Sequence, residues 1–267
     1  MASPAHRTSS TSTVTFSSSP PVTPFKAQTD GVHQAPQPST RRGRATVGLA
    51  LAATLVPAAT VAAAPSAQAA PSRYAPGTSI SASQSQQVLV ADRTSGTRGT
   101  WARYEWRGNA TGWVRVNGTS AAVFGKGGVV SGTIRKQGTN TTPAGTYSLK
   151  YAFGAGNPGT KMGYRTIGGC SYWVQSNEPD YNRWRESCAT PPRSGERLAS
   201  YVGRLYRQAV VIGYNYDRPV YGKGSGIFLH YATSYTGGCV GLTSMTELTR
   251  TVQWLDPGKN PLIVIKA

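Results

Sequence analysis

The stretch GIFLHYATSYTGGCVGL, from Gly226 to Leu242, joins an apolar strand to a Gly-Gly turn and a cysteine. Its first part, residues 226–232, is apolar and bounded by turn residues, which predicts a β-strand carrying His230. The following TSYTGG can turn the chain back, because glycine permits tight backbone conformations. We therefore expect Cys239, nine residues after His230, to face the imidazole.

This pairing suggests a nucleophilic thiol. A thiol beside an imidazole loses its proton more easily, and the thiolate is the reacting form. The amides of Gly237, Gly238 and Cys239 are suited to converge on an oxyanion. A lone cysteine or histidine is usually a packed core residue. Here a free thiol, a unique histidine and a Gly-Gly turn coincide, which favours catalysis.

The cysteine count supports the free thiol. The chain contains Cys170, Cys188 and Cys239, so at least one cysteine is unpaired within the chain. Cys170 and Cys188 flank a loop-rich stretch and are predicted to form a disulfide, which leaves Cys239 free. The cysteines form no C-x-x-C pair, and His230 is the one histidine beyond residue 33. We therefore expect no metal site and no cofactor.

The N-terminal quarter is predicted to lie outside the folded domain. Residues 1–40 are rich in Ser, Thr and Pro, which is typical of a disordered leader. Residues 41–69 hold a basic start, an apolar run and Ala67-Gln68-Ala69, the pattern of a signal peptide. A membrane anchor is the alternative; Pro57 and the A-x-A site favour cleavage near Ala69. Residues 70–85 are expected to be a linker. The sequence leaves the export route open between the general secretory and the twin-arginine pathways.

The charge balance is strongly basic. The chain has 28 Lys and Arg against 10 Asp and Glu, a net charge of +18. Up to Ala69 it carries five basic residues and Asp30, so the exported part would keep +14. Outside the cell this charge suits anionic wall polymers and at most peripheral membrane contact, whereas nucleic acid is not expected. The alternative is that the charge serves solubility alone. We expect a monomer.

Short apolar alternations broken by turn residues predict a mainly β domain over residues 86–267, either a β-sandwich or a distorted barrel. The expected strands cover residues 86–92, 100–108, 112–118, 121–125, 145–154, 208–216, 226–232 and 261–267. Two short helices are expected. One spans residues 195–208, with Leu198, Tyr201 and Leu205 on one face. The other follows a capping box of Ser244 and Glu247 and ends at Asp256-Pro257-Gly258.

At these residues the sequence resembles the L,D-transpeptidase catalytic domain of the YkuD family. The resemblance covers roughly residues 86–267. In family order, the matching pieces are Thr142-Pro143-Ala144-Gly145-Thr146-Tyr147, Ile227-Phe228-Leu229-His230, Thr236-Gly237-Gly238-Cys239-Val240, and the closing helix and strand up to Ile265. His precedes Cys, the reverse of the order in papain-like and NlpC/P60 peptidases.

The resemblance implies Cys239 as the nucleophile, His230 as its base, and oxyanion amides from the Gly237-Gly238-Cys239 turn. The family attacks the L,D bond between the third residue of a peptidoglycan stem peptide and D-Ala, and releases D-Ala. The thioester is then transferred to the amine of a second stem, giving a 3→3 crosslink. This covalent chemistry needs no metal.

The sequence departs from the family pattern at two positions near the cysteine. Gly237 replaces a second histidine, and Gly241 replaces the usual Arg or Asn. The spacing of nine from His to Cys is also shorter than usual. These departures leave two alternatives open: an L,D-carboxypeptidase or amide hydrolase, and a non-catalytic wall-binding module.

Substrate contacts are predicted at four further residues. Arg183 and Arg185 are candidates to clamp a stem carboxylate, with Tyr181 packing on sugar or peptide. The alternative for this segment is a solvated basic loop. Thr236 is expected to form a hydrogen bond near the nucleophile.

Overall fold

The structure is a computed structural model that describes residues 70–267; the predicted leader 1–40 and signal peptide 41–69 lie outside the described residues. The strands are β1 (Gln87–Ser95), β2 (Arg98–Trp106), β3 (Trp113–Arg115), β4 (Ser120–Val123), β5 (Val129–Ser131), β6 (Thr142–Gly154), β7 (Tyr164–Thr166), β8 (Ser171–Val174), β9 (Trp184–Glu186), β10 (Gly195–Arg197), β11 (Gln208–Ile212), β12 (Phe228–Tyr231), β13 (Val240–Leu242) and β14 (Leu262–Lys266). The helices are the 3-10 helix η1 (Leu198–Tyr201), the α-helix α1 (Met245–Trp254) and the 3-10 helix η2 (Pro257–Lys259).

The large sheet closes on itself. Its strands follow the order β1-β14-β6-β11-β12-β13-β4-β2, and β2 pairs again with β1. The remaining strands of this sheet are additions, since β3 extends β2 while β5 and β7 pair with β6. The prediction of a mainly β fold is confirmed, and its form is a distorted barrel. Every strand expected from the sequence is present, with shifted ends.

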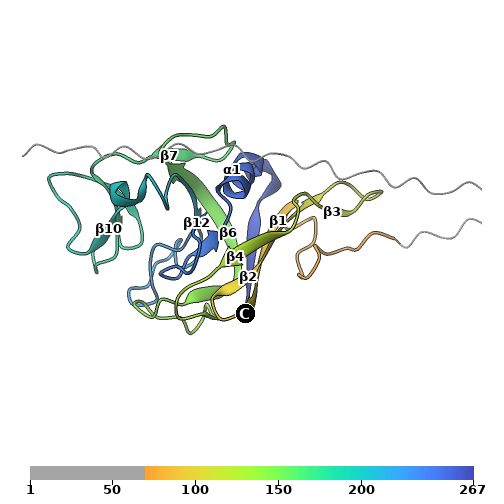
Figure 1. Cartoon of the computed structure of the whole chain (residues 1–267), viewed down its shortest axis with the longest axis horizontal. Helices are drawn as coiled ribbons and strands as arrows, with labels where there is room; N and C mark the ends of the chain where they lie inside the picture. Colours follow the sequence, from red (N-terminus) through yellow and green to blue (C-terminus); the bar gives the residue numbers. More distant parts are fainter. Residues whose placement is uncertain (1–69) are drawn as a thin grey trace, which may run out of the picture. The chain divides into compact units, whose positions relative to one another are not determined.

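Helix α1 packs against the barrel and completes its core (Figure 1). Leu248, Val252 and Leu255 are fully buried, and the Ser244 side chain caps the helix by accepting from the Glu247 amide. The Glu247 side chain departs from the capping box, because its carboxylate pairs with Arg103 at 2.9 Å. Glu247 therefore joins the helix to strand β2.

The helix predicted over residues 195–208 is wrong. Gly195–Arg197 form β10 and pair with β8, and only the single turn η1 follows. Leu198 is buried as its apolar spacing suggests, yet the strand pairing with β8 and the flanking glycines Gly195 and Gly203 outweigh helical periodicity. One α-helix, not two, is found in the part of the chain described.

A second, small sheet has the order β10-β8-β9. A disulfide joins Cys170 to Cys188 beside this sheet, with a Cα–Cα distance of 4.9 Å, which confirms the predicted bridge. In Figure 1 the part with β10 (teal) lies at the opposite end of the domain from β3 (yellow-green). We call residues 170–194 the disulfide segment.

Residues 70–85, expected to be a linker, lie against the barrel. Ala75 and Ile80 are buried and pack in one cluster with Val88, Val90 and Ala102. Apolar contacts thus extend the domain on its N-terminal side. Within residues 70–267, no helix is long and apolar enough to cross a membrane.

Candidate active site

His230 and Cys239 lie on neighbouring parallel strands. His230 belongs to β12, and Cys239 immediately precedes β13, whose Val240 is the register partner of Leu229. Cys239 therefore stands beside Phe228, two residues before His230. Because side chains alternate along a strand, Phe228, His230 and Cys239 point to the same face. The chain between them returns to the start of β12, so the strands run in one direction.

The sulfur and the imidazole each have a backbone partner. The Sγ of Cys239 donates to the carbonyl of Gly226 and accepts from the amide of Phe228, both at 3.3 Å. The Nδ1 of His230 lies 2.7 Å from the carbonyl oxygen of Tyr231. A carbonyl oxygen only accepts, so Nδ1 carries the proton and Nε2 keeps its lone pair. Within the described residues no hydrogen bond joins Sγ to the imidazole.

Both groups are neutral at pH 7. Burial raises the pKa of Cys239 to about 12, and the charge of Glu196 adds to this rise while the Phe228 amide and Arg135 oppose it. Burial lowers the pKa of His230 to about 4, although the hydrogen bond to Tyr231 opposes this shift. The Cys239 thiol thus keeps its proton, and the free imidazole nitrogen of His230 is able to accept one.

Thr236 fixes the turn that carries the nucleophile. Its hydroxyl donates to the carbonyl of Cys239 at 2.7 Å and accepts from the amide of Gly238 at 3.1 Å. The Gly238 amide predicted for the oxyanion is therefore already engaged. The amides of Gly237 and Cys239 have no hydrogen-bond partner within residues 70–267. The latter two amides are the donors left for an oxyanion.

A cavity of about 560 Å³ opens over these groups. Cys239, His230, Thr236 and Gly237 line it, so the structure brings four of the predicted residues together. Its charged lining residues are Lys126 and Glu196, which the sequence analysis missed. Tyr206 also lines it and stands edge-on to His230, with ring centroids 5.4 Å apart.

Arg135 places a buried positive charge behind the nucleophile. Its guanidinium donates to the carbonyls of Thr141 and Lys223 and is 5% exposed. A Cβ at Gly238 would lie 3.0 Å from its Nη2, and one at Gly224 would overlap Nη1. Both glycines have φ above +100°, so close approach and backbone conformation together require them. Nothing in the local sequence marks Arg135, since its contacts with Lys223, Gly224 and Gly238 are distant in the chain.

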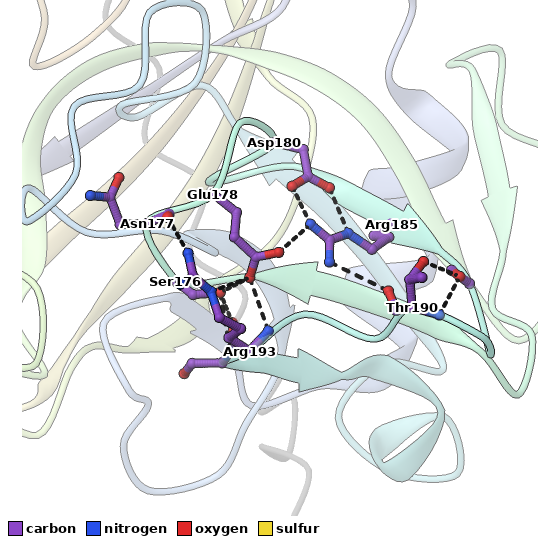
Figure 2. Close-up of polar contacts among 9 residues, drawn as sticks. Ser176, Asn177, Glu178, Asp180, Arg185, Thr190 and Arg193 are labelled. Atoms are coloured by element: carbon purple, nitrogen blue, oxygen red, sulfur yellow. Dashed lines mark hydrogen bonds and ion pairs between the residues drawn. The ribbon is translucent and has the colours of Figure 1, made fainter.

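Arg183 and Arg185, predicted to clamp a carboxylate, and Tyr181, predicted to pack on the substrate, lie outside the cavity lining. Arg185 is held by Asp180 and Glu178, as Figure 2 shows. The Arg183 guanidinium stacks on Tyr216, 4.0 Å from its ring centroid. Tyr181 is buried, and its hydroxyl donates to the Gln137 side chain. Internal partners already occupy each of them, so the prediction of a substrate clamp is not supported.

The residues described include no group of three or more His, Cys, Asp or Glu side chains that could hold a metal ion. The cavity brings together a buried thiol, an imidazole with a free lone pair and two unpaired amides. Groups of this kind are suited to acyl transfer through a thioester.

Comparison with known proteins agrees with this geometry. No curated protein and no solved structure matches the chain. A family model, the YkuD L,D-transpeptidase catalytic domain, matches residues 107–265, more than half of the chain. The match includes both β12 with His230 and the turn with Cys239. The chain therefore belongs to the YkuD family and carries an L,D-transpeptidase catalytic domain.

Proposed function

We propose that this chain is an exported transpeptidase that forms a thioester on Cys239 with a peptidoglycan stem peptide and makes 3→3 crosslinks. The observation that carries the proposal is that Cys239 and His230 share one face and one cavity, with the Nε2 lone pair of the imidazole unprotonated. Cys239 is also the one cysteine outside the disulfide.

The acylation step follows from these groups. Nε2 of His230 takes the thiol proton, and the sulfur attacks the carbonyl carbon of the L,D amide bond. The developing oxyanion accepts hydrogen bonds from the amides of Cys239 and Gly237. The C–N bond then breaks, His230 returns the proton to the leaving amine, and D-Ala departs. The remaining tripeptide is held as a thioester.

The second step releases the enzyme. The amine of another stem attacks the thioester carbon, the C–S bond breaks, and the sulfur recovers a proton. Water in place of the amine gives a free tripeptide, the outcome of an L,D-carboxypeptidase. The charge of the exported part supports retention at anionic wall polymers. Cleavage near Ala69 would deliver the domain to the cell wall.

Intact-protein mass spectrometry after incubation with a carbapenem tests the nucleophile. The β-lactam ring opens on the thiol, so the chain should gain the full mass of the carbapenem. Cys239→Ala should show no gain, whereas Cys170→Ser combined with Cys188→Ser should still react. An adduct that persists in Cys239→Ala would overturn the assignment.

The same preparation separates the alternatives. With a stem tetrapeptide as donor and a stem peptide as acceptor, a crosslinked dimer supports the transpeptidase, and tripeptide alone supports the hydrolase. A chain that binds isolated peptidoglycan without forming either product or any adduct would be a wall-binding module.

A further inference from the structure

Glu196 lacks a cationic partner in a chain rich in cations. Residues 70–267 contain nine acidic side chains, and seven of them form ion pairs. The two exceptions are Glu186, which is exposed, and Glu196. Glu196 is the one acidic residue that lines the cavity with Cys239 and His230. An unpaired carboxyl there points to a cation brought by a ligand.

The carboxyl is held in place by Tyr206. The Tyr206 hydroxyl donates to Oε1 of Glu196 at 2.7 Å, while Oε2 has no hydrogen-bond partner within the described chain. The Tyr206 ring packs edge-on against His230. Glu196 and His230 thus contact the two ends of the same tyrosine side chain, and both line the cavity.

The charge of Glu196 does not help the nucleophile. A negative charge near a thiol disfavours the thiolate, and Glu196 raises the pKa of Cys239. Burial also raises the pKa of Glu196 itself, which makes its carboxylate a better proton acceptor. The carboxyl therefore opposes acylation and suits a step that begins with a cation.

We propose that Glu196 binds the acceptor of the second step, a primary ammonium group, and removes one of its protons. This inference rests on the proposed function, because it requires a thioester on Cys239. The ammonium gives one proton to the carboxylate and becomes a neutral amine. Its lone pair forms the C–N bond, the C–S bond breaks, and the second proton of the amine passes to the sulfur. Glu196 later releases its proton to solvent.

Glu196→Gln tests this role by separating the two steps. With a stem tetrapeptide donor, the rate of thioester formation should stay equal or rise, since a charge that opposes the thiolate is removed. The ratio of crosslinked dimer to tripeptide should fall about 100-fold, the usual contribution of a positioned base. Glu186→Gln, which removes the same charge outside the cavity, should change neither quantity.

A neutral acceptor sharpens the test. Hydroxylamine is already unprotonated at pH 7 and needs no base, so its capture of the thioester should survive Glu196→Gln. Tyr206→Phe keeps the carboxylate and the ring but removes the hydrogen bond, and should lower the dimer ratio less than Glu196→Gln. Tyr206→Phe also tests the inference if circular dichroism shows that Glu196→Gln does not fold.

The outcomes are distinct. If Glu196→Gln slows thioester formation as much as it slows transfer, the inference is overturned, since Glu196 would then bind the donor or support the fold. An unchanged dimer ratio, or a wild-type protein that yields tripeptide alone, would also overturn it while leaving the nucleophile assigned. Absence of any adduct on wild-type Cys239 would instead refute the proposed function.

Discussion

The cavity at β12–β13 and the disulfide segment differ in whether their charged side chains have ionic partners. In the disulfide segment Arg185 binds Asp180 and Glu178, and Arg193 reaches the same Glu178 (Figure 2). Glu196, which lines the cavity, and Arg135, which lies against the turn at Gly238, have no ionic partner within residues 70–267. The arginine cluster of the disulfide segment satisfies its charges internally, whereas the carboxyl of Glu196 stays open to a ligand.

This contrast separates charges that stabilise the fold from charges that serve a reaction. An ion-paired group recovers part of its desolvation cost within the folded protein, whereas an unpaired buried charge lowers the free energy of unfolding. We therefore expect an unpaired charge at a cavity to bind a ligand or take part in catalysis. Substitutions in the cavity should therefore change reaction rates, and substitutions in the disulfide segment should change stability. The predictions below test that separation.

The largest effect is expected from His230→Gln. Removing the free Nε2 leaves the thiol of Cys239, whose pKa is about 12, without a base. The rate of carbapenem adduct formation, followed by intact mass, should fall by about 10² to 10⁴-fold. A rate near that of the unaltered protein would show that His230 is a packing residue, as its burial alone would suggest.

The same histidine should make stability depend on pH. Its folded pKa is about 4, below the ordinary value of 6.5, so the unfolded chain binds the proton more readily between these values. Stability should therefore be complete above pH 6.5 and fall as the pH drops towards 4, by about 3 kcal/mol. Urea unfolding at pH 7 and pH 4 measures this loss. His230→Gln should have a shallower dependence; an equal slope would assign the loss to carboxyl groups.

The sequence predicted the parts of the site that lie near each other in the chain. His230 and Cys239 share one strand-turn-strand unit, so their count and spacing were sufficient to find them. Glu196 reaches the cavity through sheet β10-β8-β9, and Arg135 reaches the turn at Gly238 from the turn after β5. Their local sequence carries no trace of these contacts. Non-local pairing, that of β10 with β8, also overrode the helical spacing of residues 195–208.

The strands also divide into those that the local sequence predicted and those that it did not. The pattern of apolar residues identified strands that line the barrel core: burial alternates along β14, whereas the first five residues of β1 are all buried. It missed β8 and β9, which are four and three residues long and lie in the stretch expected to be loop-rich, and β10, which lies in the stretch expected to be a helix. Strands this short carry too little periodicity to be recognised, and the disulfide and ion pairs hold them instead.

Removal of the disulfide should affect stability and leave the chemistry intact. Cys170→Ser with Cys188→Ser opens a loop of 18 residues, which should cost about 3 kcal/mol in the unfolded-chain entropy picture. The midpoint of thermal unfolding should fall by roughly 6–12 °C. At a temperature where the variant stays folded, the adduct should form at the original rate. A slower adduct would show that the small sheet, through β10, sets the position of the cavity wall.

The smallest effect is expected from Arg185→Gln. Arg185 contacts both Asp180 and Glu178; hydrogen bonds from Ser176 and then Arg185 lower the pKa of Glu178, and the hydrogen bond from Arg185 lowers that of Asp180. The substitution leaves both carboxylates without Arg185, but Glu178 keeps its hydrogen bonds from Ser176 and the Arg193 amide, and both carboxylates keep partial contact with solvent, which weakens ion pairs. Unfolding should therefore shift by less than with the disulfide removed, and adduct formation should not change. If Arg185→Gln instead weakened the use of a stem tetrapeptide while carbapenem acylation stayed constant, this arginine would contact the peptide after all, and the separation between the two regions would fail at that residue.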